Sequence, residues 1–246
     1  PAVCPEFTDT LCIVEGQHPV LERMGMQTFV PNGTYMSADS NCNIITGPNM
    51  SGKSTYLKQV AVLQAMAQMG SFVPAKYASF RLADQIFVRM GHRDDIETNC
   101  STFLMEMRSV NYILQNFTDN SLIVIDELGR GTSEEEGAAM CMAITEKLIN
   151  SDAFVILATH FDLMTQMESM YPNVAKQVQI FFYHMQVETE DQDGCSRLRY
   201  THRLAKGTCE RRDYGLKLAE ISNIPAPVVA RAYEVSDQIS TALPEA

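Results

Sequence analysis

The stretch that decides the fold is Thr46–Gln59, TGPNMSGKSTYLKQ, in which a loop of glycine, proline and small polar residues leads into a helical pattern. Gly47, Gly52, Lys53 and Ser54 match G-x-x-x-x-G-K-[ST], the phosphate-binding loop. In such a loop, backbone N–H groups surround phosphate oxygens at a helix N-terminus, where unpaired amides and the helix dipole favour an anion. The pattern predicts that Lys53 is solvent-accessible without ligand and reaches the β- and γ-phosphates, and that the Ser54 hydroxyl binds Mg²⁺.

The segments on either side of this loop have the order that the motif requires. Residues 42–46, CNIIT, are predicted to form a short buried strand, and residues 53–70 a helix with apolar residues at helical spacing. Strand, loop and helix in this order favour nucleotide binding over a glycine-containing turn without a ligand. The residues assigned to the nucleotide are Gly47, Pro48, Asn49, Met50, Ser51, Gly52, Lys53, Ser54 and Thr55.

A second cluster of candidate residues follows the apolar run Leu122–Ile125. This run is predicted to be a buried central strand, so Asp126 and Glu127 lie at its carboxyl end, where α/β sheets bind ligands. We predict that Asp126 holds Mg²⁺ through water and that Glu127 polarises the attacking water as a general base. The alternative is a pair of solvated acids at a strand end, and the phosphate loop upstream favours the catalytic interpretation.

The next predicted strand, at 153–160, repeats this arrangement and ends in His160. A histidine here is able to donate to the γ-phosphate and so to sense hydrolysis. On position alone, a capped polar residue is the more frequent case, and both interpretations stay open. The catalytic candidates are therefore Glu127, His160 and Lys53.

Composition limits the class of protein. The sequence has 246 residues, 46% of them hydrophobic and 20% charged, which is ordinary for one large globular domain. We find no apolar run of the ~18 residues that a membrane span needs and no secretory signal. The seven cysteines are scattered without a C-x-x-C pair, which favours reduced thiols over disulfides or a zinc site. The sequence has a net charge of −11 and shows no cluster of basic residues of the kind that DNA-binding surfaces carry. We therefore expect any DNA contact to lie outside this chain.

The order of the predicted elements indicates an α/β fold. Buried strands alternate with helices, which implies a mostly parallel central sheet with helices on both faces. We also predict a β-rich segment at 174–204, interrupted by a polar hairpin at 188–196. The other predicted elements are strands at 9–16, 34–38, 84–91 and 121–127 and helices at 101–116, 133–150, 213–222 and 225–240.

These motifs together resemble those of one family. The order and spacing of TGPNMSGKSTYLKQ, STFLMEM, DELGRGTS, ATH and YGLKLAEI are similar to those of the ATPase domain of the MutS proteins, in the ABC-type ATPase superfamily. The resemblance covers about residues 12–240. It implies a P-loop NTPase fold of the ABC-ATPase type, with ATP and Mg²⁺ as cofactors and hydrolysis of ATP to ADP and phosphate as the activity.

The resemblance also implies roles for individual residues. Asn49 matches the family's asparagine near the γ-phosphate. Ser101 matches the signature serine that reaches the γ-phosphate on the opposite subunit, although by itself it reads as a helix cap. Phe29 and Val30 match the segment that packs on the adenine, and His202 matches a position that stacks on its other face. Core packing for Phe29 and an exposed strand residue for His202 are the alternatives.

Within the family, the chain is most similar to the meiosis-specific eukaryotic type, the fourth. The segments that carry this similarity are 72–90, 94–103 and above all 129–137, GRGTSEEEG. Mismatch-repair relatives usually have an aromatic residue and Asp-Gly where this chain has Glu135, Glu136 and Gly137, and many bacterial relatives have glycine in place of Ser51. The resemblance implies an obligate heterodimer with a paralogue, the meiotic fifth type, in the nucleus on chromosomes. There it would stabilise recombination intermediates for crossover formation and chromosome synapsis.

We expect residues 1–222 to be the ATPase domain and 223–246 to be an incomplete helical dimerisation segment. DNA would be bound through domains absent from this chain, and no membrane is involved. The nearest alternative is the same domain in a mismatch-repair protein that recognises mispaired DNA. An ABC membrane-transporter subunit is disfavoured because STFLMEM replaces the L-S-G-G-Q type of signature, and a scaffold that binds ATP without turnover is disfavoured by Glu127 and His160.

Overall fold

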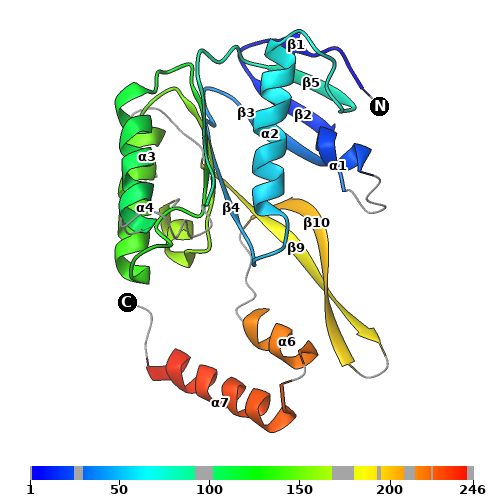
Figure 1. The fold of residues 1–246 in the computed structure, drawn as a ribbon, viewed down its shortest axis with the longest axis vertical. Helices are drawn as coiled ribbons and strands as arrows, with labels where there is room; N and C mark the ends of the chain where they lie inside the picture. The colour runs from blue at the N-terminus through cyan, green and yellow to red at the C-terminus, as the bar shows by residue number, and fades with distance from the viewer. Residues whose placement is uncertain are drawn as a thin grey trace. The chain divides into compact units, whose positions relative to one another are not determined.

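The site is carried by the larger of two compact units in a computed structural model, which describes residues 2–24, 30–91, 102–167, 180–192, 195–207, 214–222 and 224–242 (Figure 1). One unit contains Pro1–Gln186 and His202–Cys209, and the other contains Val187–Thr201 and Glu210–Ala246. The α/β class predicted from the sequence is confirmed in the larger unit.

A six-stranded sheet forms the centre of the larger unit, in the order β10-β9-β4-β8-β7-β6. The pairs β9–β4, β4–β8, β8–β7 and β7–β6 are parallel. This order brings β4, early in the chain, next to β8, so the loop after β4 and the residues after β7 and β8 meet at one edge. The strands are β4 (Cys42–Thr46), β6 (Ile86–Arg89), β7 (Leu122–Asp126), β8 (Phe154–Ala158), β9 (Ile180–Gln192) and β10 (Cys195–Lys206).

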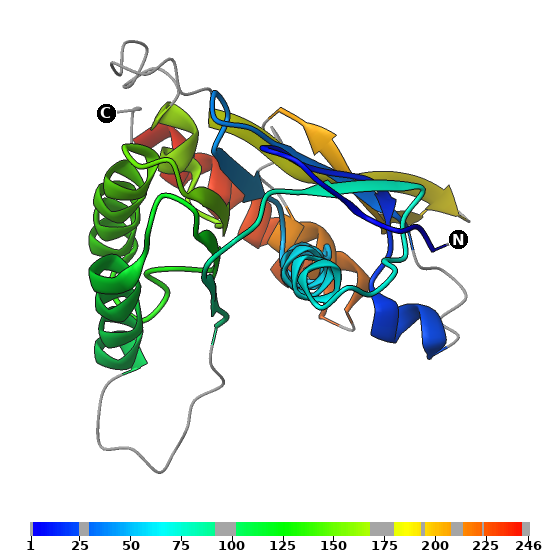
Figure 2. The same ribbon diagram turned by 90° about the horizontal axis from the view of Figure 1, so that it is seen from above.

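Helices cover both faces of this sheet because its central strands are apolar on both sides. In β7, Leu122 and Val124 join the core under α2 (Lys53–Gln68), whereas Ile123 and Ile125 join the core under α3 (Thr102–Asn116) and α4 (Glu134–Ile149). Side chains alternate between the faces of a strand, so each strand contributes to two cores. Figure 2 shows α2 on one side of the sheet and α3 and α4 on the other.

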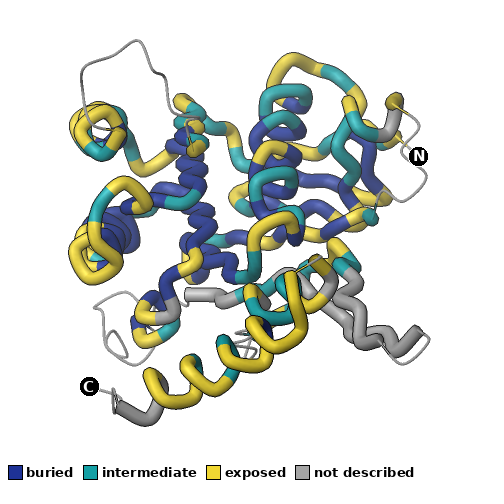
Figure 3. Tube along the Cα trace, turned by 60° about the horizontal axis from the view of Figure 1, so that its bottom comes forward, coloured by how far each residue is buried: buried dark blue, intermediate teal, exposed yellow. Residues whose placement is uncertain are grey.

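A second, four-stranded sheet covers the outer side of α2, in the order β1-β5-β2-β3. Its apolar residues, including Leu11, Ile13 and Phe80, share one core with α2 and the six-stranded sheet. Because α2 is enclosed by two sheets, it is buried on most of its surface, and buried residues concentrate in this region (Figure 3). The strands are β1 (Glu6–Phe7), β2 (Leu11–Gly16), β3 (Asn32–Met36) and β5 (Tyr77–Phe80), and the short helix α1 is Pro19–Arg23.

The smaller unit contains the outer part of the β9–β10 hairpin and the helices α6 (Tyr214–Ile221) and α7 (Ala226–Ala242), which contact each other. The division at 222/223 that we expected thus falls inside this unit. On α7, Val229 is buried, whereas Val228, Val235 and Ile239 are exposed. The 3₁₀ helix Asp162–Gln166 belongs to the larger unit.

The polar hairpin predicted at 188–196 falls where β9 ends at Gln192 and β10 begins at Cys195. Three short elements were missing from the sequence predictions. Separate second-sheet strands at 6–7 and 77–80 and the helix at 19–23 were not predicted, because short segments carry little periodicity. Among the described helices, none is long and apolar enough to cross a bilayer.

Candidate functional site

The candidate site forms where β4, β8 and β7 end side by side. Asp126 is paired with Ala158, and Ala158 with Ile45, so the carboxyl ends of the three strands are aligned. The Glu127 N–H donates to the Ala158 carbonyl (2.9 Å), and the Thr159 N–H donates to the Ile45 carbonyl (3.0 Å). The predicted loop, acids and strand-end histidine are therefore brought to one edge of the sheet.

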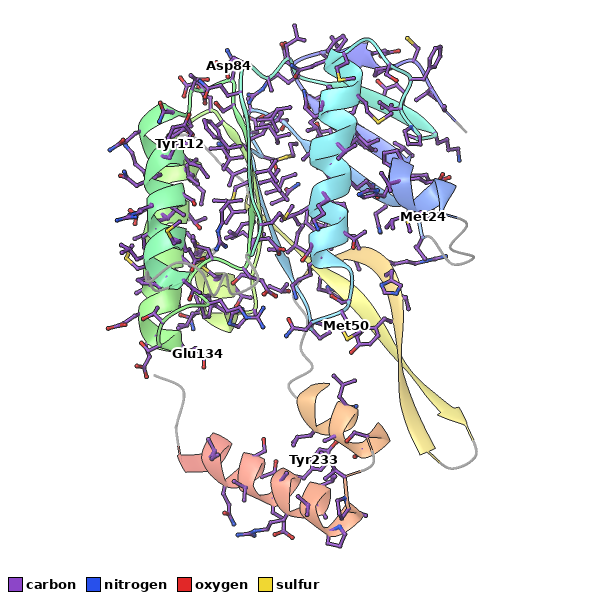
Figure 4. The ribbon with its side chains drawn as sticks, viewed as in Figure 1. Met24, Met50, Asp84, Tyr112, Glu134 and Tyr233 are labelled. Carbon is purple, nitrogen blue, oxygen red and sulfur yellow. The ribbon has the colours of Figure 1, made fainter. Side chains whose placement is uncertain are left out.

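The loop between β4 and α2 needs backbone conformations that glycine adopts readily. Gly47 and Gly52 have φ angles of 140° and 111°, and Met50, at the tip of the loop, has a φ angle of 66° (Figure 4). Positive φ values cost little for glycine and more for residues with a Cβ atom. The glycine spacing of the motif therefore sets the path of the loop, and the Met50 side chain is left 83% exposed.

Lys53 points into the loop rather than into solvent. Its ammonium donates to the carbonyls of Gly47 (2.6 Å) and Pro48 (3.0 Å) and lies 3.9 Å from Glu127 Oε1. The residue is only 4% exposed, so our prediction that it is solvent-accessible without ligand was wrong. The loop folds back so that its own carbonyls accept hydrogen bonds from the Lys53 ammonium. Burial lowers the pKa of Lys53, and the carboxylates of Glu127 and Asp126 oppose that shift.

Asp126 provides an oxygen suited to a hard cation. It is 5% exposed, and its Oδ1 atom is buried without a hydrogen-bond partner. Burial raises the pKa of Asp126, and a hydrogen bond with the Ser54 side chain acts in the opposite direction. An unpaired buried carboxylate oxygen beside a hydroxyl is a donor set that fits Mg²⁺, which in such sites takes one or two protein oxygens together with phosphate and water. The described residues contain no cluster of three or more His, Cys, Asp and Glu side chains, as a closed metal site would require.

Glu127 has an unusual backbone and two cationic neighbours. Its φ angle is 49°, which places a residue with a Cβ atom in the left-handed region. Arg130 Nη1 donates to Glu127 Oε2 (2.7 Å), and Lys53 lies on the side of Oε1. The side chain is 13% exposed, so most of it is enclosed.

His202, from distant β10, lies against the phosphate loop. Its Nδ1–H donates to the Ser51 carbonyl (2.8 Å), which requires the proton on Nδ1 because a carbonyl only accepts. Asn32 holds this part of β10, since its amide donates to the His202 carbonyl (2.8 Å) and its Oδ1 accepts from the Leu204 N–H (2.8 Å). His202 has a φ angle of 54°, in the left-handed region, so the two hydrogen bonds of Asn32 hold a strained residue of β10 in place.

Comparison with known protein families shows to which family this chain belongs. Residues 43–240 match the family model described as MutS domain V. This chain belongs to the MutS family. It is 50% identical over 242 residues to MutS protein homolog 4 of Homo sapiens, covering 97% of this chain and 25% of that protein.

Two further relatives show the breadth of the match. DNA mismatch repair protein MSH4 of Arabidopsis thaliana is 42% identical over 238 residues, covering 96% of this chain and 29% of that protein. DNA mismatch repair protein MutS of Thermotoga neapolitana is 41% identical over 240 residues, covering 95% of this chain and 29% of that protein. The MutS domain described here thus spans about a quarter of the length of its curated relatives, and the predicted family is confirmed.

The other residues predicted for the site of this MutS domain are only partly described by the structure. Phe29 and Ser101 lie outside the described residues, so their roles stay predictions. Val30 is half-buried, and its carbonyl accepts from the Asn32 amide (3.3 Å). His160 lies two residues beyond β8, exposed, with its ring tilted against the Phe161 ring at a centroid distance of 4.3 Å. Its role at the γ-phosphate also stays a prediction.

Sequence reasoning missed three polar residues that hold this site of the MutS domain. They are Asn32, Arg89 and Glu106. Glu106 lies at helical spacing from Val110 and Ile113, the buried face of α3, and Arg89 ends an otherwise apolar strand. Charges at positions that periodicity assigns to a core are the signal that would have found Arg89 and Glu106, because a buried charge needs a partner. Asn32 carries no such signal.

Cysteine chemistry is absent from the described part of the site. Cys4, Cys12, Cys42 and Cys141 are free thiols, and burial raises the pKa of Cys42 and Cys141 to about 12. A thiol with so high a pKa is a poor nucleophile at neutral pH. These two residues act as small apolar core groups.

Proposed function

We propose that this MutS domain binds Mg²⁺ and ATP and hydrolyses the nucleotide to ADP and phosphate. The observation that carries the proposal is the convergence of Lys53, Asp126 and Glu127 at the carboxyl edge of one sheet, although they come from two distant motifs. A cation for phosphate oxygens, a buried carboxylate for a metal ion and a general base are the parts that phosphoryl transfer to water needs.

Each residue has one role in the proposed reaction. Lys53 exchanges its bonds to the loop carbonyls for β- and γ-phosphate oxygens, while the loop amides bind the same phosphates. Ser54 and Asp126 would hold Mg²⁺, which would neutralise part of the negative charge of the phosphates. Glu127 accepts a hydrogen bond from the attacking water and orients it towards the γ-phosphorus.

The outer parts of the proposed site come from the family resemblance. His202 is proposed to stack on the adenine, with Phe29 and Val30 on its other face, and its position beside Ser51 and Gly52 supports this. Asn49 and His160 are proposed to contact the γ-phosphate. Ser101 is proposed to complete the nucleotide site of a second subunit, so that hydrolysis depends on a dimer.

For the whole protein, we propose a meiotic function. The relatives named MutS protein homolog 4 and MSH4 support this, because they match almost the whole of this chain. The protein would pair with a paralogue, the fifth-type homologue, and close a DNA clamp on recombination intermediates in the nucleus. With a net charge of −11, this chain suits the nucleotide-driven part of such a clamp better than its DNA-contacting surface.

Mismatch repair is the second candidate function. Bacterial relatives named DNA mismatch repair protein MutS are 41–43% identical to the chain over more than nine-tenths of its length. The nucleotide chemistry would be the same, and only the DNA preference and the partner would differ. Reconstitution with candidate paralogues on branched and on mismatched DNA separates the two, because a meiotic protein prefers branched junctions and a repair protein prefers mispairs.

The nucleotide chemistry is tested by titrating ATP with and without Mg²⁺, followed by a single-turnover assay of phosphate release. We expect saturable binding to this chain and Mg²⁺-dependent release, both absent with adenosine alone. No binding of ATP at millimolar concentration would refute the proposed function. Binding without phosphate release in the reconstituted dimer would leave the nucleotide-gated scaffold as the better description.

A further inference from the structure

A buried ion pair contacts the backbone of the segment that carries Asp126 and Glu127. Arg89, the last residue of β6, pairs with Glu106 of α3 at 3.0 Å between Nη1 and Oε1. The two side chains are 9% and 3% exposed. Burying two charges costs free energy unless they also form hydrogen bonds with the groups around them. The other contacts of the pair therefore indicate its function.

Within the part of the chain that the structure describes, those contacts go to the backbone that carries Glu127. Arg89 Nη1 also donates to the carbonyl of Asp126 (2.7 Å) and lies 3.4 Å from the carbonyl of Glu127. Glu106 Oε1 accepts from the Gly129 N–H (2.9 Å). The pair therefore holds the peptide groups on both sides of Glu127.

The backbone held in this way is strained and closely packed. Glu127 has a φ angle of 49°, and such a conformation in a residue with a Cβ atom persists only where its surroundings impose it. A Cβ atom on Gly129 would lie 2.6 Å from the Gly137 carbonyl oxygen, and one on Gly131 would lie 2.9 Å from the Phe103 amide nitrogen. The turn after β7 is thus fixed between α3 and α4, with the ion pair beneath it.

We propose that Arg89 and Glu106 are positioning residues for hydrolysis, which hold Glu127 in the orientation that aligns the attacking water. This inference rests on the proposed function. Since Glu106 belongs to α3, the helix that follows Ser101, the pair also makes the orientation of Glu127 depend on the placement of α3. A displacement of about 1 Å of a catalytic group is able to cost about a hundredfold in rate, so the pair affects turnover far more than nucleotide affinity.

The competing explanation is that the pair only stabilises the fold. Buried ion pairs are often replaceable by apolar residues of similar volume without loss of stability, whereas removing one partner leaves an uncompensated charge. The double variant Arg89→Met/Glu106→Leu therefore separates the two explanations, because it restores an apolar interior while removing every contact to the Asp126–Gly129 backbone. Glu106→Gln is the milder variant, since its amide oxygen is still able to accept from Gly129.

The experiment compares these variants with the wild-type full chain, assayed with its partner subunit, for thermal midpoint, ATP affinity and single-turnover hydrolysis. Val110→Ala, on the same buried face of α3 but outside the network, is the control for lost stability. We expect the double variant to keep ATP affinity within about threefold and a midpoint no lower than that of Val110→Ala, while its hydrolysis rate falls by roughly ten- to a hundredfold. We expect a smaller loss of rate for Glu106→Gln and a near-normal rate for Val110→Ala.

A hydrolysis rate within twofold of the wild type in both network variants would overturn the proposal while leaving the proposed function intact. The same conclusion would follow if Val110→Ala lost rate as strongly as the network variants, because the loss would then track stability. If the double variant does not fold, Glu106→Gln decides by the same comparison. A wild-type complex that binds no ATP would instead refute the proposed function, and this inference with it.

Discussion

Lys53 Nζ lies 3.9 Å from Glu127 Oε1, so the lysine of the phosphate loop and the proposed general base share one enclosed site before any ligand is considered. Arg130 contacts the other oxygen of the same carboxylate. Burial lowers the pKa of Lys53, and the Glu127 carboxylate opposes that shift. The lysine and the carboxylate thus come together without a ligand, and each of the following predictions changes one residue of the proposed site.

Lys53→Met should abolish tight ATP binding, because the ammonium that meets the phosphate charge is lost while the volume of the side chain is kept. Lys58→Met on the same helix is the matched control, since Lys58 is exposed and carries the same charge. Equilibrium titration should show a loss of about a hundredfold or more for the first variant and less than threefold for the control, given that charged hydrogen bonds each contribute about 1.5–3 kcal/mol. Unchanged affinity in Lys53→Met would remove the basis of the proposed function.

Glu127→Gln should bind Mg²⁺ and ATP normally but hydrolyse roughly a hundredfold or more slowly, the usual effect of losing a general base. The nucleotide-closed dimer should then accumulate, which size-exclusion chromatography with ATP detects. Glu134→Gln, an exposed acid in the first turn of α4, should hydrolyse at the native rate. If Glu127→Gln also hydrolyses at that rate, another residue orients the water.

Asp126→Asn should stabilise the protein in the absence of nucleotide. Burial raises the pKa of Asp126 above its ordinary 3.8, so the folded state binds this proton more strongly than the unfolded chain. Stability is therefore lost as the pH rises from 3.8 through the raised pKa, and the variant, which does not ionise, keeps it. We would measure the free energy of unfolding of the variant and of the wild type by denaturation between pH 4 and pH 8. The advantage of the variant should grow as the pH rises, and an advantage that shrinks would contradict the direction of the pKa shift.

The same variant should lose the stabilisation that Mg²⁺ and ATP give the wild type, about 2.7 kcal/mol at a ligand concentration of 100 Kd. The exposed Asp39 provides the control, because Asp39→Asn should follow the wild type in both measurements. Full stabilisation of Asp126→Asn by Mg²⁺ and ATP would mean that the carboxylate does not hold the metal.

His202→Ala should weaken ATP binding by roughly five- to a hundredfold, since stacking on a base contributes about 1–3 kcal/mol. His202→Phe should retain most of the affinity, because stacking needs a flat face and not an imidazole. Inorganic tripolyphosphate, which has no base, should bind all three proteins equally. If its binding falls too, His202 acts by shaping the loop through Ser51, and the adenine role is wrong.

Ser101→Ala, mixed with an intact partner subunit, should reduce hydrolysis at the partner's site by about tenfold, the scale of one lost charge-assisted hydrogen bond. ATP affinity at the site of this chain should stay near normal. Ser109→Ala, a half-buried serine of α3 whose hydroxyl donates to the Met105 carbonyl of its own helix, is the control. A loss at this chain's own site would show that Ser101 acts within one subunit.

The sequence by itself determined the class of fold, the family and the main residues of the candidate site. The spacing Gly47-x-x-x-x-Gly52-Lys53 is local, because positive φ angles and a helix start depend on neighbouring residues. The buried strands β7 and β8 were equally readable, since residues that alternate between two cores must all be apolar. Asp126 followed from its place at the end of such a strand.

Only the tertiary structure decided which side chains hold those residues in place. The Asn32–His202 and Arg89–Glu106 contacts join segments that no periodicity relates, and each exists because the fold brings a buried polar group beside a backbone that needs a partner. The burial of Lys53 was decided in the same way, since it depends on the loop carbonyls and on a carboxylate from another strand. Local sequence sets backbone conformation, whereas long-range packing sets burial and hydrogen-bond partners, and so the groups proposed to orient the general base Glu127 were visible only in the folded chain.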